Sequence, residues 1–229
     1  MNLANLIDGS SALIVFGGTA LATVLRCGLA DCRLTATKLA QLGQTHFDAD
    51  TTRAELAVQV QEIHQDGLLR AVPRHSGDRE FDAATDALFG TRSVAALLDT
   101  HEQHRAGRLA QAERAVRTLA QAAELAPVFG LAGTLVSLSQ LPVDGLARGA
   151  FTGAISMAVL TTLYGLLCAN LLLAPLARMV ERAALAEEAA RQQVIDWLAG
   201  QVAGSIPVQR GAARRGGPLR AVGHEAELV

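Results

Sequence analysis

The stretch Gly149–Ala177 reads GAFTGAISMAVLTTLYGLLCANLLLAPLA and contains no Asp, Glu, Lys or Arg. A helix needs about 20 mainly apolar residues to cross a bilayer, so this stretch predicts a transmembrane helix. Gly9–Leu25 and Leu125–Val143 also lack these charged residues and predict two more spans. Gly9–Leu25 is short, but the side chain of Arg26 can reach the membrane interface and extend the span.

Basic residues are distributed unevenly around the three predicted spans. No Lys or Arg precedes the first span, and the loop Pro142–Gly149 holds only Arg148. All the others lie in residues 26–124 or from Arg178 onward. The positive-inside rule therefore predicts an inner-membrane protein with its N-terminus outside and its C-terminus in the cytoplasm. The lack of a basic segment before the first span favours a retained helix over a cleaved signal peptide.

The predicted fold class is an all-α membrane protein, with three transmembrane helices and long helices that extend into a cytoplasmic helical domain. The expected organisation is a first transmembrane helix in 1–30, a cytoplasmic helical domain in 31–123, a transmembrane pair in 124–177, a cytoplasmic helix in 178–203 and a disordered tail in 204–229.

Apolar residues recur at helical spacing outside the spans as well. Between Asp31 and Gln65 they predict one or two amphipathic helices. A helical pattern resumes at Phe81, and we expect it to break near Gly90. From Asp99 the only helix-weakening residue is Gly107, so one helix is predicted to run into the second span.

Composition excludes several classes of function. Hydrophobic residues make up 50% of the chain and the mean hydropathy is +0.26, which is rare for a soluble domain. A net charge of -2 and 3% aromatic residues argue against a nucleic-acid partner. No catalytic motif is present, so an enzyme is not expected, and nothing predicts a cofactor.

Cysteine and histidine spacing gives no metal or disulfide pattern. The three cysteines, Cys27, Cys32 and Cys168, follow no recognised spacing and are predicted to be buried or inert thiols. His101 and His104 are three residues apart, but no third ligand accompanies them. We therefore expect no metal site, and a solvated helix face at the two histidines.

The predicted spans contain no acidic residue, since Glu124 lies just before the second span. A proton path through a membrane normally requires an ionisable group at depth. If this protein conducts protons, a partner must supply the carboxylate.

Small and hydroxyl-bearing residues are frequent in the second and third spans. Gly130, Gly133 and Ser137 fall on nearly one helical face. Such hydroxyl groups can bind a water chain or a partner carboxylate, or they can bond carbonyl groups of their own helix and pack helices together. Likewise Pro127 and Pro175 either fix where the helices begin and end or act as hinges. The pattern leaves both pairs of alternatives open.

Two segments resemble the MotA/TolQ/ExbB proton-channel family. Leu125–Leu141, LAPVFGLAGTLVSLSQL, resembles that family's APxxGxxGTVxGL segment, and Ile155–Ala177 resembles its MAVALLTTLYGxxxANxxxxPLA segment. The TTLYG sequence is typical of the MotA branch, whereas TolQ and ExbB carry a glutamate where this chain has Met157. Ile7–Val24 looks like the second of the four MotA membrane helices. The resemblance therefore implies that the first of the four is missing, and we expect a three-span layout that matches TolQ and ExbB.

The resemblance implies an assembly and a set of functional residues. It implies a homopentamer of this subunit, in contact with membrane lipid, around a dimer of a MotB-, ExbD- or TolR-like single-span partner whose aspartate carries the proton. It implies pore-lining roles for Thr134, Thr161 and Thr162. The residues expected to act in packing or as hinges are Pro127, Gly130, Gly133, Tyr164, Gly165 and Pro175.

We therefore expect the pore or stator subunit of a channel that converts ion flow into rotation or mechanical work. The alternatives are a non-conducting membrane scaffold and an ExbB- or TolQ-like energiser of outer-membrane transport. In flagellar stators a charged pair in the cytoplasmic loop engages the rotor. Ala84–Thr100 offers Asp86, Arg92 and Asp99 but no clear equivalent of that pair, and the choice between protons and sodium ions stays open.

Overall fold

The computed structural model describes residues 8–43, 47–67, 77–139 and 148–204, and within these residues it contains helices and no strand. The predicted outer hairpin and C-terminal tail fall mostly outside the described residues. The helices are α1 (Gly9–Ala12), the π-helix η2 (Leu13–Gly17), α2 (Gly18–Cys27), α3 (Leu29–Gln41), α4 (Ala49–Asp66), α5 (Arg79–Thr91), α6 (Val94–Ser139), α7 (Arg148–Leu167), the π-helix η3 (Cys168–Leu173) and α8 (Ala174–Ala203).

Among the described residues, three continuous helices are long and apolar enough to cross a membrane: Gly9–Cys27, Val94–Ser139 and Phe151–Ala203. The predicted all-α fold with three membrane helices is thereby confirmed. In the most apolar windows of these helices only 22%, 28% and 22% of the residues are buried inside the subunit. The remaining surface is left for lipid or for other subunits.

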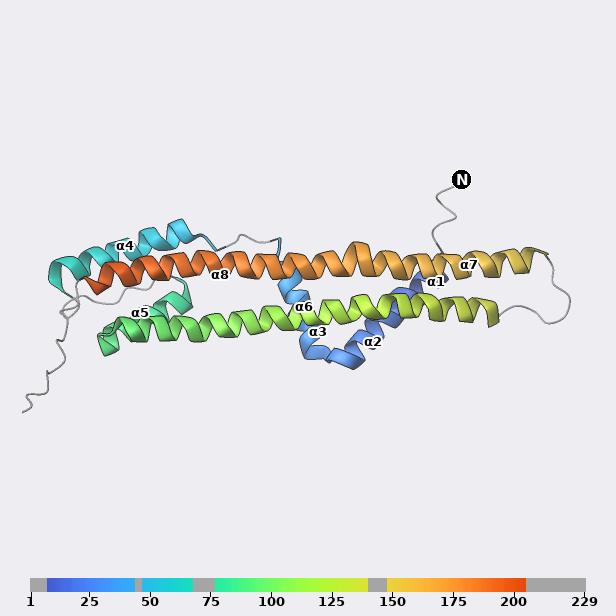
Figure 1. The fold of residues 1–229 in the computed structure, drawn as a ribbon, viewed down its shortest axis with the longest axis horizontal. Helices are drawn as coiled ribbons and strands as arrows, with labels where there is room; N and C mark the ends of the chain where they lie inside the picture. Colours follow the sequence, from blue (N-terminus) through green and yellow to red (C-terminus); the bar gives the residue numbers. More distant parts are fainter. Residues whose placement is uncertain (1–7, 44–46, 68–76, 140–147, 205–229) are drawn as a thin grey trace, which may run out of the picture.

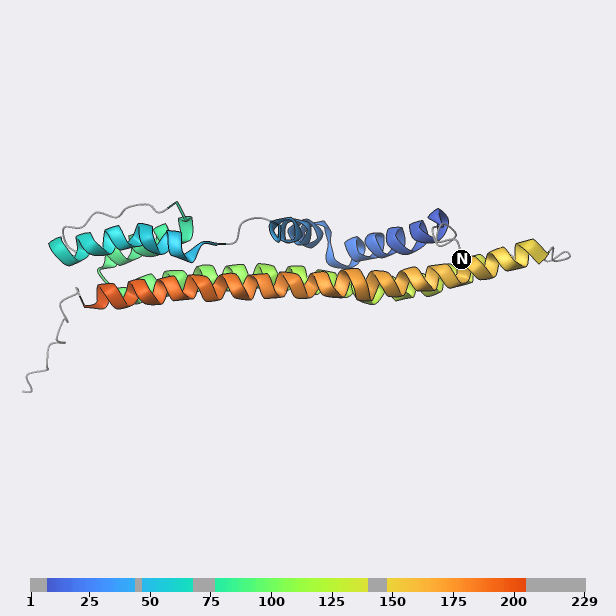
Figure 2. The ribbon, with the colours of Figure 1, turned by 90° about the horizontal axis from the view of Figure 1, so that it is seen from above.

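The long helices form one layer of a two-layer structure (Figures 1 and 2). α6 and the continuous α7–η3–α8 run side by side in opposite directions, and α1–α5 lie on one side of this pair. No described element covers the other side of the pair. The first membrane helix ends at Gly28, whose positive φ of 85° turns the chain into α3.

A hydrophobic core holds together the part of the molecule farthest from the apolar segments. It joins α4, α5, α6 and α8, and its largest fully buried side chains include Leu56, Ile63, Phe81, Leu97 and Ile195. Burial of one such side chain contributes about 1.5–3 kcal/mol to folding. Residues 31–65, predicted to form one or two helices, form two, α3 and α4.

The break expected near Gly90 lies two residues later. Gly90 is inside α5, and the chain reverses at Arg92, which has a left-handed conformation with φ 57°. The carbonyl of Ser93 then accepts hydrogen bonds from the amides of Ala96 and Leu97 at the start of α6. A left-handed residue ends a helix, and here that residue is an arginine rather than the glycine that the sequence suggested.

Neither proline of the spans interrupts its helix. Pro127 lies within the 46 residues of α6, so the predicted run of one helix into the second span is confirmed. Pro175 lies in the first turn of α8, directly after the π-helix η3. A π-helical turn is one of the ways in which a helix accommodates a local defect in its hydrogen bonding.

Candidate functional site at the crossing of the membrane helices

Three glycines allow α6 and α7 to approach closely. A Cβ atom added to Gly165 would lie 2.7 Å from the carbonyl oxygen of Ala126. One added to Gly130 would lie 3.0 Å from the carbonyl oxygen of Thr161, and one added to Gly133 would lie 2.8 Å from the Thr161 side chain. At Gly130, Gly133 and Gly165 the two helices therefore approach each other closely, as helices with small residues do in membranes.

The same contacts fix the register of the two antiparallel helices. Gly133 faces Thr161, which has no exposed surface, and Ser137 is buried on the same side of α6. Thr161 therefore lies between α6 and α7 of one subunit. A pore-lining role for Thr161 stays a prediction, and within this subunit its side chain is part of the helix packing.

Thr134 and Thr162 follow Gly133 and Thr161 by one residue each. Successive residues of a helix are rotated by about 100°. Because α6 and α7 run in opposite directions, these rotations turn both side chains to the same side of the pair. Both side chains are half-buried, so the two threonines form one polar patch on the helix pair.

The opposite side of the helix pair is covered by the first membrane helix. The Phe129 ring packs against Gly18, where a Cβ atom would clash with it. The Tyr164 hydroxyl accepts a hydrogen bond of 3.2 Å from the Asp8 amide, and the Tyr164 ring stacks on Phe16. Tyr164 thus anchors α7 to the first helix, and the Thr134–Thr162 patch faces the side that no described element covers (Figure 2).

The hydroxyl groups of these helices donate to carbonyl groups of their own helix. Thr134 donates to Leu131 at 2.6 Å, and Thr161 and Thr162 both donate to Ala158, at 2.9 and 3.2 Å. This is the local bonding that a purely structural role predicts. Each hydroxyl oxygen can still accept a hydrogen bond, so Thr134 and Thr162 can also accept one from a group on the uncovered side.

No acidic group enters the described spans, residues 9–25, 125–139 and 151–177. Two acids border these spans: Glu124, directly before the second span, and Asp8, which caps the first helix at its start. Hydrogen bonds from the Ser11 and Ser10 hydroxyl groups lower the pKa of Asp8 to about 2. Asp8 is therefore negatively charged at neutral pH.

His101 departs from the expected solvated face. It is buried beside Phe81, with ring centroids 6.2 Å apart, and its Nε2 has no hydrogen-bond partner among the described residues. Burial lowers the pKa of His101, which lies outside the apolar part of α6. The solvated-face expectation is wrong because His101 follows the core residue Leu97 by one helical turn.

Neither histidines nor cysteines assemble a metal site in the described part of the chain, where no three potential ligands gather. Cys168 is buried, as expected, and packs with Ala126 and Ala169. Cys27 and Cys32 are only half-buried, and the Cys27 thiol contacts the side-chain oxygen of Gln121 at 3.0 Å.

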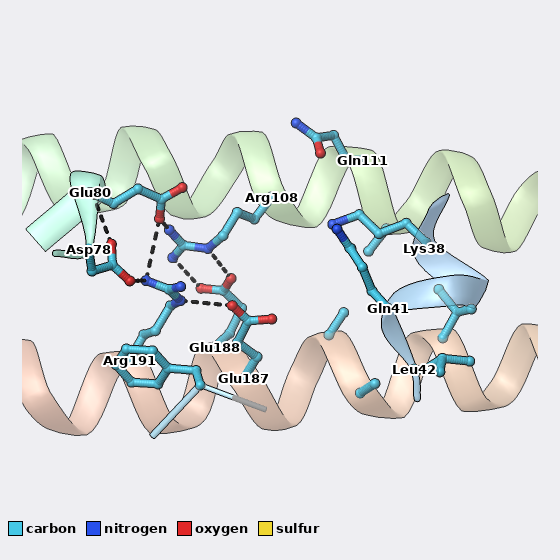
Figure 3. A pocket seen from close by; sticks show the side chains of 15 residues that line it. Lys38, Gln41, Leu42, Asp78, Glu80, Arg108, Gln111, Glu187, Glu188 and Arg191 are labelled. Carbon is cyan, nitrogen blue, oxygen red and sulfur yellow. Dashed lines mark hydrogen bonds and ion pairs between the residues drawn. The ribbon is translucent and has the colours of Figure 1, made fainter. Parts of the chain in front are cut away.

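A cluster of charged side chains joins α5, α6 and α8 outside the membrane segments, and the sequence did not reveal it (Figure 3). Arg108 binds both carboxylate oxygens of Glu188, at 2.5 and 2.8 Å, and also pairs with Glu80. Arg191 pairs with Asp78 at 2.8 Å and with Glu187 at 2.9 Å. These six residues are called the charged cluster below. Only the spacing of Glu187 and Arg191, four residues apart, could have been found in the sequence.

Comparison with known proteins gives three kinds of match. The sequence profile described as "MotA/TolQ/ExbB proton channel family" matches residues 79–193, half of the chain. Motility protein A of Borreliella burgdorferi is 33% identical over 85 residues, covering 37% of this chain and 33% of that protein. The uncharacterized protein YtxD of Bacillus subtilis is 33% identical over 128 residues, covering 56% and 43%. The matches thus span less than half the length of either curated relative.

Two solved structures share the fold. MotAB of C. jejuni superposes with a TM-score of 0.78 at 18% identity, covering 90% of this chain and 82% of that chain. The flagellar MotAB stator complex from Bacillus subtilis gives a TM-score of 0.74 at 18% identity, covering 90% and 84%.

Proposed function

Because the chain belongs to the MotA/TolQ/ExbB proton channel family, we propose that it is the pore or stator subunit of a complex that converts ion flow into rotation or mechanical work. The family predicted from the two membrane motifs is confirmed, and the matches to motility protein A and to the MotAB structures are MotA-like. The role proposed is that of a channel subunit and not of an enzyme.

The main support for a channel is the polar patch formed by Thr134 and Thr162 in described spans that contain no acid. Thr134 and Thr162 lie on the side of the α6–α7 pair that no described element covers. An ion needs polar groups to cross the bilayer, and a proton needs a titratable one. We propose that a single-span partner places an aspartate beside these two threonines and that this aspartate carries the proton.

The proposed assembly is a homopentamer around a dimer of such a partner. The large share of span surface that one subunit leaves uncovered supports assembly with further helices. Two of the solved structures that share the fold are MotAB complexes, which supports a MotB-like partner. Arg26 and Arg178, which follow the first and third apolar segments, support an inner-membrane orientation with the N-terminus outside and the C-terminus in the cytoplasm.

Co-purification in detergent with a candidate single-span partner tests the assembly. The mass of the intact complex is expected to correspond to five copies of this chain and two of the partner. A complex that contains no partner, or this chain as a monomer, would contradict the proposal.

Two neighbouring threonines test the proposed pore face. Thr162→Val is expected to reduce proton flux through the reconstituted complex about tenfold or more, because the lost hydroxyl stabilises a charge in a low-dielectric site. Thr161→Val is the matched control, since both hydroxyls donate to the Ala158 carbonyl, but Thr161 is fully buried whereas Thr162 is only half-buried. Equal flux in both variants, with assembly intact, would contradict the assignment of the face.

A non-conducting scaffold is the second candidate, and the hydroxyl groups that bond their own helices favour it. A scaffold predicts that Thr134→Val and Thr162→Val together leave function unchanged.

The structure also offers a test of which kind of mechanical work the ion flow drives. Asp86, Arg92 and Asp99 are all exposed at the end of the molecule formed by α5 and the start of α6, and a rotor-engaging role predicts that their charge reversal impairs motility but leaves ion flux intact.

A further inference from the structure

A cavity of about 580 Å³ lies between α3, α5, α6 and α8 (Figure 3). Lys38 and Gln41 reach into it from α3, and Gln111 lines it from α6. The charged cluster forms the opposite wall. Small and apolar residues, among them Ala112 and Ala183, line the space between the two walls.

The two walls carry opposite charge. Among the described residues Lys38 makes no hydrogen bond or ion pair, so its ammonium group is available on its wall of the cavity. In the charged cluster, four carboxylates outnumber two guanidinium groups by two. A ligand that fits both walls therefore has an anionic group and a cationic group a few ångströms apart.

The cavity begins close to the membrane surface. Val180, which lines it, is three residues beyond Ala177, the last residue of the third apolar segment, a distance of about 5 Å along the helix. The headgroup layer of a bilayer is about 5–8 Å thick on each side. α3 lies across α6 and α8 rather than along them (Figures 1 and 2), as a helix at a membrane surface does.

Apolar side chains continue from the cavity towards the membrane segments. Leu39 and Leu42 of α3 pack with Leu173 and Leu176 around the buried Val180. Such a surface suits a hydrocarbon chain that extends from a group held in the cavity. A free phosphate ion would use the Lys38 wall but would gain nothing from these leucines.

We propose that this cavity binds the headgroup of a phospholipid that carries a primary amine. The lipid phosphate pairs with Lys38 and accepts hydrogen bonds from the side-chain amides of Gln41 and Gln111. The lipid ammonium group faces the carboxylate of Glu187, and an acyl chain follows the leucines of α3. This site is independent of ion conduction, so the proposal stands apart from the proposed channel function.

Native mass spectrometry of the full-length chain in detergent tests the site, by titration with phosphatidylethanolamine and with phosphatidylglycerol. We expect the amine lipid to bind more tightly than the glycerol lipid. Lys38→Gln should weaken binding of the amine lipid about tenfold, the effect of losing one charge-assisted hydrogen bond, and Lys38→Arg should restore most of it. Arg33→Gln is the matched control, because Arg33 is exposed on the same helix and does not line the cavity.

Three results would overturn the proposal. Equal weakening by Lys38→Gln and Arg33→Gln would show general attraction between lipid and a basic helix. Tighter binding of phosphatidylglycerol than of phosphatidylethanolamine would show that the carboxylates do not select a lipid with an amine. Displacement of the lipid by excess inorganic phosphate would identify the ligand as a free anion.

Discussion

Substitution of Gly165 by alanine is expected to push the membrane helices apart. The added Cβ would lie 2.7 Å from the Ala126 carbonyl oxygen, 3.1 Å from the Gly130 Cα and 3.2 Å from the Pro127 Cα. All three are backbone atoms, which cannot rotate away as a side chain can. Ordinary contact begins at 3.4 Å, so α6 and α7 must separate by about 0.7 Å at this point.

The cost of Gly165→Ala follows from two opposing effects. Overpacking of a close contact costs about 1–3 kcal/mol, and a clash with backbone atoms lies at the upper end. Alanine gains about 1 kcal/mol over glycine in a helix, so the net loss is expected to be about 2 kcal/mol. Gly153 of α7 is the matched control, because nothing lies within 4 Å of an added Cβ there. Gly153→Ala is expected to be neutral or slightly stabilising.

Labelling of Cys168 by a thiol reagent during a denaturing detergent titration measures this loss. Cys168 is buried against Ala126 at the helix crossing, so it reacts when α6 and α7 separate. The half-buried Cys27 and Cys32 are first replaced by serine. The reasoning is refuted if Cys168 is as well protected in Gly165→Ala as in Gly153→Ala.

Three further predictions concern the part of the molecule outside the membrane segments, and thermal unfolding checks each. Glu188→Gln should cost about 3 kcal/mol, because it breaks a buried ion pair with Arg108, whereas the exposed Glu113→Gln should cost less than about 0.5 kcal/mol. The pKa of His101 is lower in the folded than in the unfolded protein, because burial favours the neutral ring. The free energy of unfolding should therefore be highest above about pH 6.5 and should fall as the pH drops towards the folded pKa. His101→Gln should remove this pH dependence of the stability. Arg92→Gly should stabilise by up to about 1 kcal/mol, because Arg92 has a positive φ that glycine adopts without strain. An Arg92→Gly variant less stable than the parent, or a His101→Gln variant with unchanged pH dependence, would contradict these accounts.

The membrane helices could be predicted from the sequence because their physical signal is local. A stretch without charged residues must be long enough to cross the bilayer, and Gly149–Ala177 and Leu125–Val143 are long enough. The continuation of α6 from the extramembrane part into the membrane was predictable for the same reason, since between Asp99 and Leu125 only Gly107 weakens the helix.

The charged cluster and the burial of His101 depend on contacts between distant segments. A periodic signal was nevertheless present: Leu97, His101 and Arg108 share one face of α6, which continues as the buried Ala112 and Ala115. The sequence predicted a solvated face at His101 because Phe81, which packs on it, comes from α5. The carboxylates that pair with Arg108 likewise come from α5 and α8. No local pattern reveals such partners.

The roles of the neighbouring Thr161 and Thr162 could not be separated by sequence. Which of the two faces α6 depends on the register between α6 and α7, and that register is set by the contact of Thr161 with Gly133. The structure thereby places Thr161 in the packing between the two helices and Thr162 in a half-buried position beside it.

A channel whose proton-carrying group comes from a partner conducts protons only when that partner is present. The most direct test is proton flux into liposomes that contain the purified chain alone or together with its single-span partner, under an imposed membrane potential. The account predicts no flux above empty liposomes for the chain alone, because its described spans contain no acid, and flux when the partner is present. Robust proton flux through the chain alone would contradict it.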